Sequence, residues 1–279
     1  MQAVLDYINS FILGIIQGIT EWLPVSSTGH LIIWQGFTGE LISADFTEMF
    51  DVVVQFGSIL AVVVLFWNKL FPFSKSKTPE QRKEVYSLWL KVIVAVAPAG
   101  VIGILLDDWL DSVFYNHYVV SATLIIYGIL FILIENRNKN RTFSTDSIAA
   151  LSYKTALLIG CFQLLALIPG TSRSGTTILG AVILGCSRFV AAEFSFFMAV
   201  PVMLGASALK MLKHGFDFNA HQIIVLLIGM VTAFVVSIFA LKFLVGYVRK
   251  HDFKVFGYYR IALGIVLIVY FVLNSAIFN

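Results

Sequence analysis

Charged residues are scarce in this sequence: Asp, Glu, Lys and Arg make up 13% of it, against about 25% in soluble domains. Hydrophobic residues account for 59%, and the mean hydropathy is +0.89. This composition excludes an ordinary soluble domain and predicts an all-α polytopic membrane protein. Cysteine is scarce too. Cys161 and Cys186 stand alone without metal-type spacing, so we expect both to be small buried hydrophobes.

The N-terminus lacks the basic residues that open a signal peptide, because Asp6 and Asn9 stand in their place. No cleaved signal peptide is therefore expected. Nothing in the composition indicates a nucleic-acid partner, so the expected surroundings are membrane lipids.

Ten apolar stretches can be read along the chain, and a membrane span needs roughly 20 apolar residues. Six stretches qualify as full spans: 48–67, 88–106, 118–135, 192–212, 222–243 and 256–278. The other four form two pairs, 4–23 with 25–37 and 155–168 with 176–186. A proline, Pro24 or Pro169, interrupts each pair, and proline breaks helical hydrogen bonding. Each pair is therefore predicted to be a re-entrant hairpin.

The two halves of the sequence repeat the same order of elements. A shift of 144–145 residues lays Leu23-Pro24 on Ile168-Pro169 and Phe50 on Phe194. We therefore predict two repeats of opposite topology, 1–145 and 146–279, within one membrane domain. Each repeat is a re-entrant hairpin followed by three spans. Inverted repeats with broken helices place a site near the midplane, at their interface.

Basic residues are distributed unequally over the predicted loops. With both hairpins re-entrant, fourteen fall on one side: Lys69, Lys75, Lys77, Arg82, Lys83, Arg137, Lys139, Arg141, Lys154, Arg188, Lys242, Arg249, Lys250 and Lys254. Only Lys210 and Lys213 fall on the other side. The positive-inside rule makes the richer side cytoplasmic. Both termini are then expected outside, and the first hairpin enters from the outer face.

A first polar island interrupts the apolar sequence between Gln17 and His30 and holds Glu21, Ser26, Ser27 and Thr28. An ionisable group at membrane depth is costly and is by default a functional hypothesis. Gln17 and Glu21 are four residues apart and share a helix face. Two glycines, at positions 14 and 18, form a small-residue face on which another helix can pack closely.

A second island contains Ser172, Arg173, Ser174, Gly175 and Thr176. Arginine presents a planar fork of donors that suits phosphate oxygens, and the surrounding backbone can bind anions. If the two islands meet, they indicate phosphoryl transfer. Arg173 and nearby amides would then hold the phosphates, and a structural ion pair with Glu21 is the alternative for Arg173.

The first island supplies the other groups that such a reaction needs. Ser27 or His30 would attack phosphorus or activate water, and the residues alone do not decide between them. Glu21, with Gln17, would hold a divalent cation through oxygen ligands. Three further acidic or amide residues lie near the ends of predicted spans and are expected to be packing or interfacial groups: Asp51, Gln55 and Glu193. The histidines outside the island lack acidic residues at useful sequence spacing and are expected to be surface or interface residues: His117, His214, His221 and His251.

Both islands resemble known signatures. The stretch from Gln17 through Glu21 to Leu-Pro-Val-Ser-Ser-Thr-Gly-His, ending at His30, resembles the first signature of the undecaprenyl-diphosphate phosphatases, the bacitracin-resistance family. The stretch Ala166 to Thr177 resembles the second. Further similarity at 50–59, 193–197 and 259–261 extends the resemblance over nearly the whole chain. Position 17 is Gln where some members have Glu.

The resemblance implies an integral membrane enzyme of the bacterial cytoplasmic membrane that converts undecaprenyl diphosphate into undecaprenyl phosphate and inorganic phosphate. This reaction recycles the carrier lipid of cell-wall synthesis and confers bacitracin resistance. It also implies a divalent metal, Mg²⁺ or Ca²⁺, and a site open to the outer face. Catalytic or phosphate-binding roles are implied for Glu21, Ser27, His30 and Arg173, with Ser26, Thr28, Ser172, Ser174, Gly175 and Thr176 as their motif neighbours. The oligomeric state stays open, a homodimer included.

A transporter or flippase for isoprenyl phosphate lipids is the alternative, because inverted repeats and broken helices are typical of transporters. Such a protein has only to bind the head group. Arg173 would then matter, whereas Ser27 and His30 would be dispensable.

Overall fold

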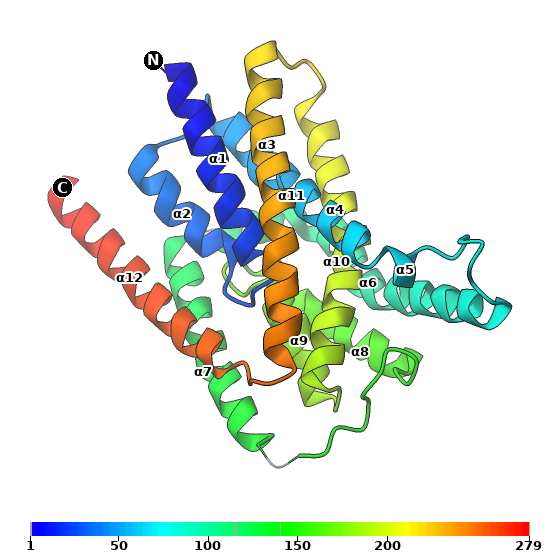
Figure 1. Ribbon diagram of the computed structural model, residues 1–279. Helices are drawn as coiled ribbons and strands as arrows, with labels where there is room; N and C mark the ends of the chain where they lie inside the picture. Colours follow the sequence, from blue (N-terminus) through cyan, green and yellow to red (C-terminus); the bar gives the residue numbers. More distant parts are fainter. Residues whose placement is uncertain (1, 115, 140, 279) are drawn as a thin grey trace.

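A computed structural model describes residues 2–114, 116–139 and 141–278. Within these ranges the regular elements are helices (Figure 1). One isolated β-bridge pairs Thr145 with Cys186. The helices are α1 (Gln2–Thr20), α2 (Ser27–Thr38), α3 (Ala44–Val53), α4 (Gln55–Leu65), α5 (Trp67–Leu70), α6 (Pro79–Phe114), α7 (His117–Arg137), α8 (Tyr153–Gln163), the 3₁₀ turn η1 (Leu164–Leu167), α9 (Arg173–Ile183), α10 (Arg188–His214), α11 (Ala220–Val248) and α12 (Lys254–Phe278).

Seven helical segments of the described chain are long and apolar enough to cross a membrane. They are Gln2–Thr20, Ala44–Leu65, Pro79–Leu106, His117–Arg137, Arg188–His214, Ala220–Val248 and Lys254–Leu273. The chain is therefore a multi-pass, all-α membrane protein, as predicted. Six of the seven correspond to the six expected spans, and the seventh is α1, which the sequence assigned to a hairpin.

Helix α1 packs in parallel along α11. A Cβ on Gly14 would lie 2.7 Å from the carbonyl oxygen of Gly229, and one on Gly18 would lie 2.9 Å from that of Ala233. The predicted small-residue face of α1 is therefore confirmed. Gly18 lies beside Ser237, whose Oγ is 3.3 Å from the Gly18 carbonyl oxygen. Ser237 precedes the end of α11 by eleven residues, about 16 Å of helix, so α1 accompanies only part of α11.

Helix α8 packs on α6 in the same way. The Ser87 and Tyr153 hydroxyls are 3.3 Å apart, and a Cβ on Gly160 would meet Ala95. Residue numbers rise together along both helices, so this pair is also parallel. The first helix of each half of the sequence thus lies against a helix of the other half. Cys186 is buried as expected, but Cys161 on α8 is exposed, because α8 turns its other face to α6.

Helices α7 and α12 lie side by side and antiparallel, with Gly128 against Gly257 and Ser121 against Gly264 (Figure 1). Helix α2 lies against α12, where Gly29 faces Leu263. The chain therefore runs along α1, turns within the molecule, and continues along α2 beside α12.

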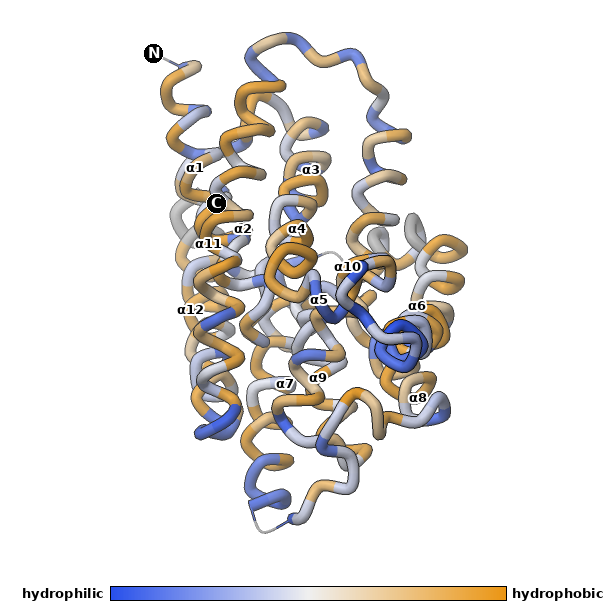
Figure 2. Tube along the Cα trace, turned by 45° about the vertical axis from the view of Figure 1, so that its right-hand side comes forward, coloured by the Kyte–Doolittle hydropathy of each residue, from blue (hydrophilic) through white to orange (hydrophobic). Residues whose placement is uncertain are grey.

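The loops predicted to share one side of the membrane do meet at one end of the molecule. Ser144 N donates to Gly185 O across 3.0 Å, and the Arg249 guanidinium lies 4.5 Å from the Phe189 ring centroid. Lys69 Nζ is 2.6 Å from Glu193 Oε1. Figure 2 shows hydrophilic residues at this end, where α7 ends and α12 begins.

Candidate active site

The two predicted breaks have the same local geometry. Ser26 precedes α2 with φ 72°, and Ser172 precedes α9 with φ 71°. A residue other than glycine in this region costs about 1–3 kcal/mol and persists only where the surrounding structure imposes it. Each serine follows its break proline, Pro24 or Pro169, so the sequence-level match of the two islands is also a match of backbone conformation.

Arg260 joins the two breaks. Its side chain is fully buried and donates from Nη1 to Pro24 O across 3.2 Å. Its Nη2 donates to Gly170 O across 2.9 Å and to Thr171 O across 3.0 Å. These carbonyl groups belong to irregular backbone inside the molecule, where no helix or sheet satisfies them. The guanidinium therefore fixes the start of α2 next to the start of α9.

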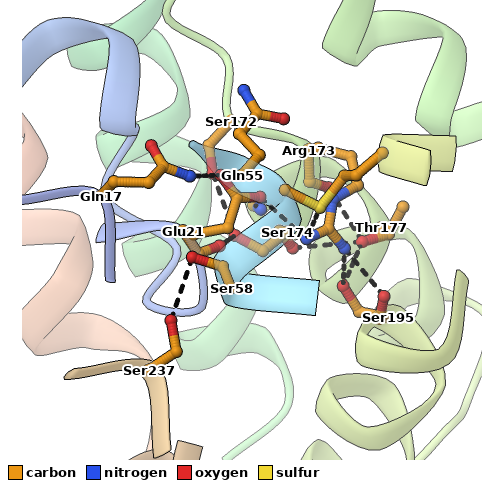
Figure 3. A network of polar contacts seen from close by, with 12 residues as sticks. Gln17, Glu21, Gln55, Ser58, Ser172, Arg173, Ser174, Thr177, Ser195 and Ser237 are labelled. Carbon is orange, nitrogen blue, oxygen red and sulfur yellow. Dashed lines mark hydrogen bonds and ion pairs between the residues drawn. The ribbon is translucent and has the colours of Figure 1, made fainter. Parts of the chain in front are cut away.

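The two polar islands meet as predicted, and they do so through the Glu21–Arg173 ion pair that was the structural alternative for Arg173. Arg173 Nη2 lies 2.9 Å from Glu21 Oε1, and both side chains are largely buried (Figure 3). Arg173 Nη1 donates to the carbonyl oxygen of Ser195 at 2.8 Å, whereas its buried Nε has no partner. Ser174 Oγ donates to the Glu21 carbonyl oxygen across 3.1 Å. The guanidinium is thus held in place and still has one donor unused.

Gln17 and Glu21 share one face of α1, as predicted. Gln17 Nε2 donates to Glu21 Oε2 across 2.9 Å, and Gln17 Oε1 is buried without a partner. No group of three or more His, Cys, Asp or Glu side chains in the described part of the chain could hold a metal ion by itself. Mg²⁺ often uses one carboxylate together with substrate phosphates and water. The pair, with its unused amide oxygen, fits a cation site of that shared type.

The hydroxyl groups of the second island are arranged around the first turn of α9. Ser172 Oγ accepts from Gly175 N at 3.1 Å and lies 3.1 Å from Ser174 Oγ. The Thr176 hydroxyl donates to Arg173 O across 3.0 Å. The start of α2 is different: Ser26 makes no capping hydrogen bond, and its Oγ is buried without a partner. The first N–H groups of α2 therefore lack the cap that those of α9 have.

His30 uses both ring nitrogens within the protein. Nδ1 is 2.7 Å from Ser26 O, and Nε2 is 2.7 Å from the Tyr259 hydroxyl. Because a carbonyl oxygen only accepts, Nδ1 carries the proton in the neutral ring, and Tyr259 donates to Nε2. His30 therefore links the start of α2 to α12 through its hydrogen bonds to Ser26 and Tyr259.

Ser27 lies at a pocket of about 150 Å³. Thr28 also lines it, together with Gln35, Asp51 and Gln55. Gln35 Nε2 donates to both carboxylate oxygens of Asp51, at 3.0 and 2.8 Å. Gln55 is also among the residues drawn with the Glu21–Arg173 network in Figure 3. Asp51 and Gln55 thus line a pocket beside the first island, whereas the sequence indicated only packing or interfacial groups.

Sequence reasoning missed two further groups. Arg260 was noted only as part of a resemblance, although a lone arginine in the apolar stretch 256–278 is itself a signal of an intramembrane role. His221 has no acidic residue at useful sequence spacing, but its Nε2 lies 2.9 Å from Asp6 Oδ2. This partner is 215 residues away in sequence, so no local spacing could reveal it.

This arrangement defines a class of protein: a multi-pass membrane protein with a buried charged site between two broken helices. The family described as bacitracin resistance protein BacA matches residues 10–266. The chain belongs to this family.

Curated relatives resemble this chain over almost its full length. The undecaprenyl-diphosphatase of Acetivibrio thermocellus is 56% identical over 268 residues, 96% of this chain and 98% of that protein. Undecaprenyl-diphosphatase 1 of Clostridioides difficile is 58% identical over 271 residues, 97% and 98% of the two chains. The undecaprenyl-diphosphatase of Enterococcus faecalis is 56% identical over 267 residues, 95% and 97%.

Proposed function

We propose that this protein hydrolyses undecaprenyl diphosphate to undecaprenyl phosphate and inorganic phosphate. The reaction returns the carrier lipid to cell-wall synthesis and confers resistance to bacitracin. The observation that carries the proposal is the convergence of two helix starts and the Glu21–Arg173 pair inside a membrane protein, in a chain whose relatives are named for this activity.

The diphosphate is held where the two breaks meet. Helix N-termini attract anions because their first N–H groups are unpaired and the helix dipole is positive there. The uncapped start of α2 and the start of α9 supply such groups around Ser26, Thr28 and Ser172. Arg173 supplies its unused Nε, and its Nη2 shifts from Glu21 to a phosphate oxygen. Ser174, Gly175 and Thr176 lie in the first turn of α9 and bind the phosphate there, as expected from the sequence.

Ser27 is the nucleophile, because it faces a pocket while both nitrogens of His30 are engaged by the protein. Its Oγ forms a bond to the terminal phosphorus as the bond to the bridging oxygen breaks, and undecaprenyl phosphate leaves. Asp51, in the same pocket, accepts the hydroxyl proton. Water then hydrolyses the phosphoserine, which restores Ser27 and releases inorganic phosphate. His30 positions the start of α2.

Gln17 and Glu21 would hold a divalent cation, Mg²⁺ or Ca²⁺. Such a cation would supply positive charge to neutralise the phosphate oxygens. Glu21 would be available for it once Arg173 binds the substrate. The unpartnered Gln17 Oε1 supports this arrangement.

The two helix pairs, α1–α2 and α8–α9, are re-entrant hairpins of two inverted repeats, 1–145 and 146–279. Three observations support this topology. Both breaks have a serine of the same unusual φ, α1 stops about 16 Å before α11 ends, and α1–α11 mirrors α8–α6. The basic end is cytoplasmic, so the termini and the first hairpin face outward from the inner membrane, and the site opens there.

The test is phosphate release from undecaprenyl diphosphate by the purified full-length protein in detergent, with Mg²⁺ and with EDTA. Arg173→Lys keeps a charge opposite Glu21 but lacks the planar fork. We expect a loss of at least 10-fold for Arg173→Lys, at least 100-fold for Arg173→Ala, and reversible inhibition by EDTA. The exposed Arg137→Ala is the matched control and should keep full activity.

Each arm has an outcome that contradicts the proposal. Arg173→Ala within threefold of wild type would remove the phosphate clamp from the mechanism. Activity that survives EDTA would reassign Glu21 to proton transfer. No release from folded wild-type protein would favour the lipid transporter, and lipid movement in vesicles would then be measured.

A further inference from the structure

A second pocket lies at the opposite, basic end of the molecule. Its volume is about 270 Å³, and it lies among the end of α7, the start of α10 and the segment that follows α11. Its lining is Glu135, Lys139, Arg188, Val248, Arg249, Lys250, His251 and Asp252. Val248 lies about 16 Å of helix beyond Ser237, the residue that touches the candidate active site end of α1. The pocket is therefore separate from that site.

Both carboxylates of this pocket already have partners. Arg188 Nε lies 2.9 and 3.0 Å from the two oxygens of Glu135, and Arg188 Nη2 also contacts Glu135. Glu135 Oε1 accepts from Phe253 N as well. Asp252 accepts from Lys254 N at 3.1 Å, and its other oxygen is 3.3 Å from Lys254 Nζ. Neither carboxylate is left to neutralise the remaining cations.

Three cationic side chains remain around the pocket: Lys139, Arg249 and Lys250. None of them forms an ion pair with a carboxylate of the described residues. Arg249 stacks on the Phe189 ring, which holds its guanidinium plane in position. Three like charges on adjacent helix ends repel one another. An anion bound among these three side chains relieves that repulsion. The positive charge of the pocket therefore favours anion binding.

We propose that this pocket binds the phosphate group of an anionic membrane lipid. Basic pockets between the ends of membrane helices are suited to lipid head groups. Arginine offers a fork of donors and lysine a mobile point charge, and both bind phosphate oxygens. Leu133 on α7 and Phe243 on α11 lie less than two helical turns from the pocket residues of these helices, and both are exposed. Exposed apolar side chains at these positions can contact the acyl chains of a bound lipid. The inference does not rest on the proposed phosphatase activity.

The experiment titrates the purified full-length protein, in neutral detergent, with phosphatidylglycerol and with phosphatidylcholine of the same chains. Bound lipid is counted by native mass spectrometry. The test variant is Lys139→Gln/Arg249→Gln/Lys250→Gln. The control, Lys75→Gln/Lys83→Gln/Lys154→Gln, removes three exposed basic residues predicted for the same end but outside the pocket lining. Both triples change net charge equally, and Lys250→Gln alone serves if the test triple is poorly folded.

We expect at least 10-fold weaker phosphatidylglycerol binding in the test triple, at least threefold in Lys250→Gln, and less than twofold change in the control. Phosphatidylcholine should bind weakly to all of them. Equal weakening in both triples would mean general attraction between charges and would overturn the proposal. Displacement of the lipid by millimolar inorganic phosphate would also overturn it, since the pocket would then prefer a soluble ion.

Discussion

Replacing Arg260 by methionine tests whether one buried guanidinium holds the two halves of the site together. The substitution keeps a long unbranched side chain but removes the donors to Pro24, Gly170 and Thr171. Each carbonyl left unsatisfied costs about 1–3 kcal/mol, and relief from burying a charge offsets part of the sum. A net cost of about 3 kcal/mol is smaller than the stability of a typical domain. The loss should therefore appear as separation of the breaks and not as global unfolding.

The functional effect follows from this separation. A displacement of about 1 Å between catalytic groups can cost about 100-fold in rate, so Arg260→Met should lower phosphate release by at least that factor. Size-exclusion profiles should stay those of the wild type. Arg137→Met makes the same chemical change at an exposed position and should leave the rate unchanged. Release within threefold of wild type from Arg260→Met would refute the reasoning, because the breaks would then hold their positions without the guanidinium.

Two further predictions use the pocket and the α1–α11 contact. Ser27→Ala should lower phosphate release by about 10³-fold or more, whereas His30→Gln should keep over a tenth of the rate; the reverse order would make His30 the nucleophile. Gly14→Ala should lower the thermal transition by overpacking α1 against α11, at about 1–3 kcal/mol. Gly100→Ala, with open space around it, should be neutral or slightly stabilising, and an equal loss in both variants would contradict the close packing.

Sequence patterns predicted the features that depend on short spacing or on composition. The i,i+4 relation of Gln17 and Glu21, the glycine face of α1 and the apolar spans are all local properties, and the structure contains them. The meeting of the two islands was predicted because inverted repeats with broken helices place a site at their interface. One more segment than the six predicted spans is long and apolar enough to cross a membrane, and it is α1.

The remaining features depend on packing between distant segments. The sequence indicated only a packing or interfacial role for Asp51, because nothing near it in sequence marks the pocket it shares with Ser27. Its partner Gln35 comes from another helix, and the turn between them decides that contact. Arg260 likewise acquires its role from two breaks that precede it by about 90 and 236 residues. Such roles emerge only when the helices are placed in space.

The Glu21–Arg173 pair also has a consequence for how the chain is made. The two residues are 152 positions apart, and synthesis proceeds at about 5–20 residues per second. Glu21 is therefore synthesised roughly 8–30 s before Arg173, and α11, against which α1 packs, is made later still. During that interval the carboxyl group of Glu21 lacks its native ion-pair partner. Helix α1 can complete its native contacts only after most of the chain has been synthesised.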